Sequence, residues 1–74
     1  MIDLEGLTLA AAAAEFARYG GAPIRVPQQL VAARKVTGLF SASDPAGFAR
    51  AAALSLGLEV RSDGNTISIV EPDR

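Results

Sequence analysis

The chain has 74 residues, half of them hydrophobic, and a net charge of −1 from 7 basic and 8 acidic side chains. This length allows one domain, and we expect residues 1–70 to form its packed part and residues 71–74 a frayed tail. The sequence has neither cysteine nor histidine, which excludes disulfides and thiolate metal sites and removes the usual general base. A domain this small must therefore be stabilised by packing alone.

No segment has the pattern of a membrane helix or a signal peptide. The longest apolar stretch, Leu7 to Ala14, is far shorter than the ~20 residues that span a bilayer. The opening residues, Met1 to Glu5, lack the basic start of a signal peptide. We expect either a cytosolic protein or a piece of a longer exported chain.

The chain begins with the pattern of a strand followed by a helix. Ile2 and Leu4 alternate with acidic residues, as in a half-buried strand. Thr8 is expected to cap a helix over residues 9–19, because its hydroxyl can accept from a free backbone N–H one turn on. A run of alanines favours that helix, and Gly20-Gly21 is expected to end it.

A short second strand and a connector follow. The strand is expected over Ile24–Val26 and is stopped by Pro27, which has no N–H to donate. Residues 28–34 are expected to form a connector without regular structure. Leu30 and Val31 are its large apolar residues, and we expect both to be tucked into the core.

The third strand is expected over residues 36–42, where apolar and polar residues alternate. The two faces of this strand are predicted to carry Val36, Gly38 and Phe40 toward the core, and Lys35, Thr37 and Leu39 on the opposite side. Leu39 is therefore expected to face either a second layer or solvent, and an exposed leucine alone indicates little. Beside an open strand edge, however, Leu39 could anchor a partner strand.

The second long helix has clear start and stop signals. Either Ser43 or Asp44 is expected to cap it, and Pro45 suits a first turn where no N–H is needed. The helix is expected to end near Leu56, before Gly57. Both long helices are apolar nearly all round, which predicts that they are buried on more than one side.

The last segment is predicted to be a β-hairpin. Leu58 to Val60 and Ile67 to Ile69 alternate with polar residues, and residues 62–65 form the loop, in which Gly64 can take a positive φ. The chain thus contains two β-α-β units, the second extended by a hairpin strand. These units predict an α+β fold of two small sheets with two helices between them, leaving short strands with open edges.

No constellation of residues indicates catalysis or a cofactor. Asp3 and Glu5 face the same way and could share a metal ion, but a solvated strand face is the favoured explanation. The serines and threonines have no histidine to activate them, and nothing near Lys35 resembles a nucleophile elbow. Gly20-Gly21 precedes a strand, whereas a phosphate loop precedes a helix. We therefore expect no enzyme, no cofactor, no metal and no small-molecule ligand.

Nucleic-acid binding is not indicated either. The basic residues alternate with acidic ones and form no stripe. The three phenylalanines lie at core-facing positions, so no aromatic platform is left for bases. The remaining candidate is a protein-binding face on the third strand, made by Lys35, Thr37 and Leu39; the alternative interpretation of Arg34-Lys35 is a solvated strand end.

Five short segments carry a family resemblance: Phe16-Ala17-Arg18-Tyr19, Ile24-x-Val26 with Leu30, Val36-Thr37-Gly38-Leu39-Phe40, Asp44-Pro45-x-x-Phe48 and Leu56-Gly57-Leu58-x-Val60. In this order, over roughly residues 2–70, they resemble the C-terminal domain of FecR-type anti-sigma regulators. That domain is related in fold to the short N-terminal (STN) domain of secretins and TonB-dependent transducers.

The resemblance implies a fold and a partner. The fold is two helices between a two-stranded and a three-stranded sheet. The partner is the N-terminal signalling domain of an outer-membrane TonB-dependent transducer, which signals that a ferric siderophore is bound and so controls an extracytoplasmic-function sigma factor. The implied location is the periplasm, as part of an inner-membrane-anchored protein in which this segment itself does not enter the membrane.

Three positions depart from the family patterns. Ala17 stands where the family often has Asn, and Pro27-Gln28-Gln29 where an Asp-Pro turn is frequent. Leu56-Gly57-Leu58 replaces the longer Gly-Thr-Gly-Leu signature of transducer domains, which favours a regulator over a receptor. The alternative is an STN-type signalling or assembly domain of a TonB-dependent receptor or a secretin, and a small enzyme or ligand-binding domain is disfavoured by the missing His, Cys and Trp.

Overall fold

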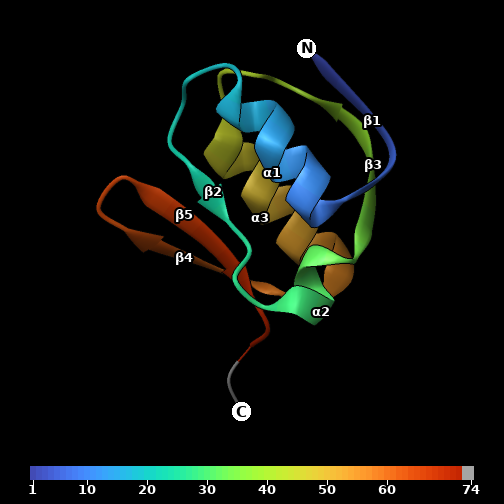
Figure 1. Ribbon diagram of the computed structural model, residues 1–74, viewed down its shortest axis with the longest axis vertical. Coiled ribbons are helices and arrows are strands. Elements are labelled where there is room, and N and C mark those ends of the chain that lie inside the picture. Colours follow the sequence, from blue (N-terminus) through green and yellow to red (C-terminus); the bar gives the residue numbers. More distant parts are fainter. Residues whose placement is uncertain (73–74) are drawn as a thin grey trace.

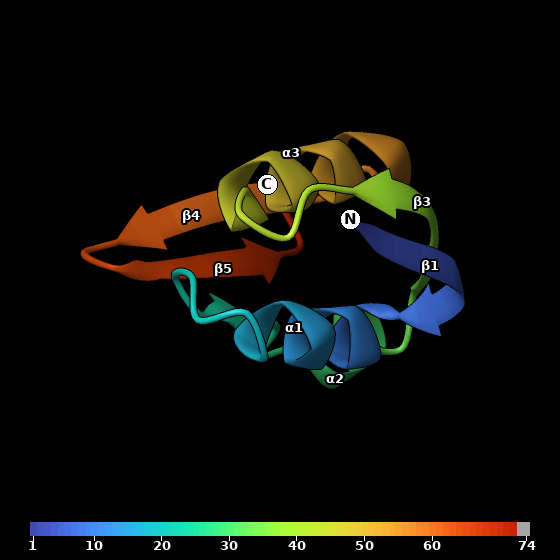
Figure 2. The same ribbon diagram turned by 90° about the horizontal axis from the view of Figure 1, so that it is seen from above.

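A computed structural model describes residues 1–72, and all five of its strands lie in two separate sheets. Its elements are β1 (Ile2–Thr8), α1 (Leu9–Ala17), β2 (Ile24–Arg25), α2 (Gln29–Ala32), β3 (Lys35–Phe40), α3 (Pro45–Leu56), β4 (Glu59–Asp63) and β5 (Thr66–Val70). One sheet has the order β1-β3 and the other β2-β5-β4. The helices α1 and α3 lie between the two sheets (Figures 1 and 2). This arrangement confirms the predicted α+β fold.

Both sheets are built from the two halves of the chain. β1 pairs antiparallel with β3, and β2 pairs parallel with β5, while β4 and β5 form the hairpin. The two strands of each β-α-β unit therefore go to different sheets. As a result, neither unit completes a sheet by itself.

The helix caps lie where the sequence signals place them. The Thr8 hydroxyl accepts a hydrogen bond from the Ala11 N–H at 3.1 Å, which satisfies one free donor of α1. Asp44, rather than Ser43, caps α3 by accepting from the Gly47 N–H at 3.0 Å. Gly57 ends α3 in the left-handed conformation, with φ of 70°. α1 ends at Ala17, two residues earlier than predicted.

Three phenylalanines pack together: Phe16 and Phe48 are buried in the core, and the partly buried Phe40 packs against them. Phe48 of α3 stacks on Phe16 of α1, with ring centroids 4.7 Å apart, and meets the ring of Phe40 edge-on at 4.9 Å. Buried residues of both sheets and all three helices surround these rings. Among residues 1–72 no polar or charged side chain is buried, so the core is held by apolar packing.

The connector between β2 and β3 contains a helical turn that the sequence analysis did not predict. Val31 of α2 is buried as expected, but Leu30 is 80% exposed, so the prediction that both enter the core is wrong. Neighbouring residues of a helix point about 100° apart, so a single turn resting on the core can insert only one of the two.

Both long helices are buried on more than one side, as predicted, but each keeps one exposed side. The sheets flank the helix pair on two sides, and the outward side of each helix stays open (Figure 2). On α3 the exposed residues are Ala46, Arg50, Ala51, Leu54 and Ser55, and on α1 they are Ala10, Ala14 and Ala17. Five short strands cannot enclose two helices completely, and here alanine marks solvent-facing positions as well as close contacts.

The C-terminal hairpin has a tighter turn than predicted. Asp63 pairs with Thr66, so the loop is reduced to Gly64-Asn65, and Gly64 has φ of 62°. Beyond β5, the Glu71 N–H donates to the Gln28 side-chain oxygen at 2.7 Å. The rest of the predicted tail, residues 73–74, lies outside the described residues. Among residues 1–72, no helix has both the length and the hydropathy needed to cross a bilayer.

Candidate protein-interaction surface

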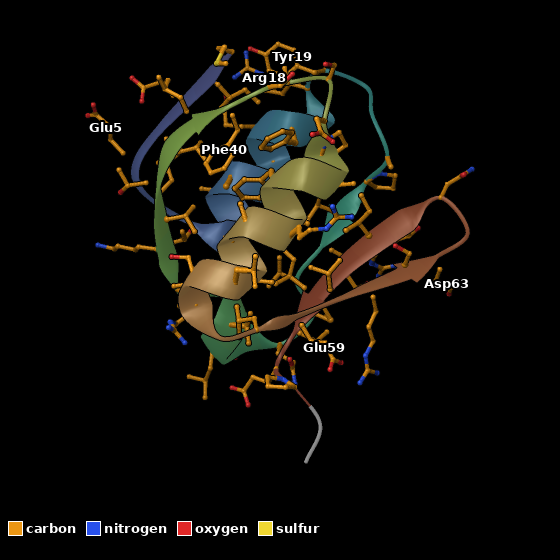
Figure 3. The ribbon with its side chains drawn as sticks, turned by 180° about the vertical axis from the view of Figure 1, so that it is seen from behind. Glu5, Arg18, Tyr19, Phe40, Glu59 and Asp63 are labelled. Atoms are coloured by element: carbon orange, nitrogen blue, oxygen red, sulfur yellow. The ribbon has the colours of Figure 1, made fainter. Side chains whose placement is uncertain are left out.

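The side of the β1–β3 sheet that faces away from the helices holds the predicted site residues. On β3 the side chains alternate as expected, and Lys35, Thr37 and Leu39 are all exposed. On β1 the exposed side chains are those of Asp3 and Glu5, and Figure 3 shows Glu5 pointing away from the molecule. We call these five residues the β1–β3 outer face.

Strand pairing sets the neighbours on this face. Asp3 lies opposite Leu39, and Thr8 lies opposite Lys35. Leu39 is 65% exposed, so an apolar side chain stands in solvent next to a carboxylate. Because both strands of a two-stranded sheet have one unpaired edge, this face adjoins backbone that a further strand can bind.

Gly38 lies on the inner side of β3, directly behind the β1–β3 outer face. A Cβ atom at Gly38 would lie 3.1 Å from a ring carbon of Phe40, and its φ of 150° is one that other residues rarely adopt. The Phe40 ring therefore packs over a position that only glycine leaves open. This contact ties the strand that carries Thr37 and Leu39 to the phenylalanine cluster.

A β-bulge in β1 shapes the other half of the face. The register shifts between Leu4 and Leu7, so that Glu5 and Gly6 together stand opposite Thr37. Gly6 has φ of 63°, which is the conformation glycine provides in such bulges. The extra residue returns Leu7 to the side of Ile2 and Leu4, although the spacing from Leu4 to Leu7 would otherwise place it outward.

Thr37 closes the bulge. Its hydroxyl oxygen accepts a hydrogen bond from the Gly6 N–H at 3.0 Å, a donor that the shifted register leaves without a ladder partner. From the sequence, Thr37 was predicted only to bind a partner, and its contact with Gly6 was not predicted. The signal that could have revealed it is the change of apolar spacing from two to three residues around Gly6.

The charged side chains of the β1–β3 outer face do not belong to the ion pairs found in the described part of the chain. Those pairs are Arg18–Glu15, at 3.4 Å, and Arg61–Glu59, at 3.1 Å. Asp3, Glu5 and Lys35 take part in neither. Within residues 1–72 there is no pocket, and no three potential ligands among His, Cys, Asp and Glu come together as a metal site. The site hypothesis thus concerns a flat, mixed apolar and charged face.

Comparison with known proteins gives a structural match and no sequence match. No protein-family model matches the chain, and no curated protein is similar to it in sequence. The fold is of the STN type. This is supported by its structural similarity to a chain of a secretion complex. That complex is the Salmonella SPI-1 type III secretion injectisome basal body, with the proteins InvG, PrgH and PrgK; the TM-score is 0.78 and the identity 27%.

The extent of the match limits what it supports. It covers 96% of this chain but 15% of the Salmonella chain, so the protein corresponds to one small part of a much longer one. It supports the secretin side of the sequence resemblance and gives no support to the FecR-type regulator. The proposed binding role of Lys35, Thr37 and Leu39 stays a prediction.

Proposed function

We propose that this chain is a protein-binding assembly domain of an envelope-spanning secretion complex, of the kind formed by secretins, and that it works in the periplasm. The observation that carries the proposal is the match of nearly the whole chain to a basal-body component, at a TM-score of 0.78. Its task is binding rather than catalysis, and it needs no cofactor.

The β1–β3 outer face is the surface we assign to a protein component of such a complex. Leu39 supplies an apolar anchor that gains free energy when it is covered. Asp3, opposite Leu39, and Lys35, at the start of β3, carry opposite charges, which select the orientation of a partner more than they add affinity. A partner strand laid along the free edge of β3 would lie beside Leu39 and Lys35, with Asp3 one strand farther away on β1.

A second candidate function rests on the five sequence segments that resemble FecR-type regulators. In that case the partner is the signalling domain of a TonB-dependent transducer, and the chain controls an extracytoplasmic-function sigma factor. Sequence beyond this chain separates the two candidates. One upstream membrane helix supports the regulator, and a downstream secretin core supports the assembly domain.

The test is a binding titration with a substitution at the anchor. The chain is titrated, with NMR detection, against secretion-complex components and transducer signalling domains encoded near it. We expect Leu39→Asp to weaken binding to the cognate component at least tenfold, about 1.4 kcal/mol, because a carboxylate would replace the apolar anchor beside Asp3.

Leu54→Asp is the matched control, since Leu54 is also exposed but lies on α3, away from this face. It should leave the affinity unchanged. Equal loss in both variants, or unfolding of Leu39→Asp by circular dichroism, would show that Leu39 is not a binding anchor. Binding to a transducer domain alone would favour the second candidate.

A further inference from the structure

The strand β4 presents a regular, unpaired edge. It is the outer strand of the three-stranded sheet, and among residues 1–72 no helix or strand lies beyond it (Figure 1). Its residues pair with β5 in five consecutive steps, from Glu59 opposite Val70 to Asp63 opposite Thr66, without a register shift. Strand edges are commonly blunted by proline, bulges and charged side chains; Glu59–Asp63 has neither proline nor bulge, and its charged residues are of both signs.

The other edges differ from β4. β2 has only two residues and lies between Pro23 and Pro27, and β1 is interrupted by its bulge. β3 is regular but belongs to the outer face described above. β4 is therefore the edge of the three-stranded sheet with the backbone geometry to accept another strand.

The turn determines which backbone groups of β4 point outward. In a hairpin with a two-residue turn, the pair that flanks the turn is hydrogen-bonded, and such pairs then alternate with non-bonded ones. Glu59, Arg61 and Asp63 therefore direct their backbone groups to β5, while Val60 and Ser62 direct theirs away from it. The Ile67 N–H, which donates to the Pro23 oxygen on the opposite side of β5 at 2.9 Å, agrees with this alternation.

The side chains on the outer face of β4 alternate in charge. Glu59, Arg61 and Asp63 follow one another at every second position, negative, positive and negative, and Figure 3 shows Glu59 and Asp63 toward the two ends of the strand. Within the chain the Arg61 guanidinium donates to Glu59 at 3.1 Å. Such a pattern is complementary to its own antiparallel copy when the two are shifted by two residues, so that Glu59 lies opposite Arg61 rather than Asp63.

Three symmetric antiparallel registers of two β4 strands differ in the side chains that they set opposite each other. Centred on Arg61, two copies of β4 would set arginine against arginine and Glu59 against Asp63. Centred on Ser62, Arg61 would face Asp63 but Ser62 would face Ser62. Centred on Val60, Glu59 and Arg61 face each other twice in non-bonded pairs, where side chains are closest, and the half-buried Val60 side chains meet on the inner side.

We propose that β4 is the dimerisation edge of this protein: a second copy of the chain adds its β4 antiparallel to the first, in the register centred on Val60. The result is a six-stranded sheet across a two-fold axis. This inference goes beyond the proposed function and uses the opposite sheet from the β1–β3 outer face. An edge of five residues buries less than the ~1,200 Å² of a standard interface, so the dimer is a weak one.

The test is sedimentation equilibrium of the 74-residue chain and three variants over concentrations up to about 1 mM, the affinity range expected for so small an interface. Arg61→Glu sets glutamate against Glu59 at both pairs, and Glu59→Arg sets arginine against Arg61. Each should weaken dimerisation at least about tenfold, because two attractive pairs become repulsive.

The double variant Glu59→Arg/Arg61→Glu restores both pairs in reversed order and should dimerise like the parent chain. In the Ser62-centred register the double variant would set the glutamate at position 61 opposite Asp63, so its dimer would remain weak. Dimerisation as strong as that of the parent chain therefore identifies the Val60-centred register. Circular dichroism checks that all variants fold. A parent chain that stays monomeric throughout, single variants that dimerise unchanged, or a double variant that is not rescued would each overturn the proposal.

Discussion

Phe48 is the side chain on which the core depends most at the scale of single residues. It is 1% exposed and contacts both Phe16 and Phe40. We expect Phe48→Ala to lower the free energy of unfolding by about 3–5 kcal/mol, through lost burial and a cavity that the rings cannot fill. At about 0.05–0.15 kcal/mol per residue, a chain of this size has only a few to roughly ten kcal/mol in total. Urea denaturation followed by circular dichroism measures the loss.

Leu54→Ala is the control on the same helix. Its side chain is 81% exposed, so truncation should change the free energy of unfolding by no more than about 0.5 kcal/mol. If Phe48→Ala were as mild as Leu54→Ala, α3 would not be packed between the two sheets, and the central feature of the fold would be wrong.

At the scale of elements, the bulge in β1 depends on one side chain of the neighbouring strand. Thr37→Val keeps the shape of the side chain but cannot accept the hydrogen bond from the Gly6 N–H. We expect a loss of roughly 0.5–1.5 kcal/mol, partly offset because valine suits strands. The clearer measurement is amide hydrogen exchange, which should become faster at Gly6 than in the parent chain.

Thr37→Ser keeps the hydroxyl and should leave the exchange at Gly6 close to that of the parent chain. The pair of variants separates the structural role of Thr37 from its predicted binding role. If both variants leave Gly6 unchanged, the hydrogen bond does not hold the bulge. If Thr37→Val then still weakens partner binding, the binding role alone explains this residue.

Elements with strong local signals could be predicted from the sequence. Thr8, Asp44 and Gly57 act within one turn of their own helices, so their roles do not depend on the rest of the fold. The alternation along β3 likewise identifies its two faces, and with them the exposure of Lys35, Thr37 and Leu39. This is why the residues of the candidate site lie together as expected.

Features set by long-range contacts could not be predicted. The strand order follows from which halves meet in space, and the bulge at Gly6 is defined only against Thr37, 31 residues away. The same applies to Leu30 and Leu54, because an apolar pattern cannot show that other elements leave them uncovered. Alanine adds to this ambiguity, since it suits exposed helix faces as well as tight contacts.

At the scale of the whole molecule, the fold joins two similar halves that depend on each other. β1 and β2 of the first half pair with β3 and β5 of the second half. The core cluster likewise draws on both sides of the β2–β3 connector, from Ile2 and Leu9 to Phe48 and Ile69. The repeated β-α-β pattern is therefore a repeat of sequence, while the folding unit is the complete chain.

A division of the chain between Arg34 and Lys35 tests this dependence. Residues 1–34 should be unfolded alone, since both of their strands lack partners. Residues 35–74 retain a two-stranded hairpin and a helix of 12 residues, both marginal in isolation. Mixed together, the fragments should regain helical circular dichroism beyond the sum of their separate spectra, and NMR signals as dispersed as those of the whole chain. A dispersed spectrum from residues 35–74 alone would instead mean that α3 and the hairpin bury enough apolar surface without Leu4, Leu9 and Phe16, contrary to a core in which Phe16 stacks directly on Phe48.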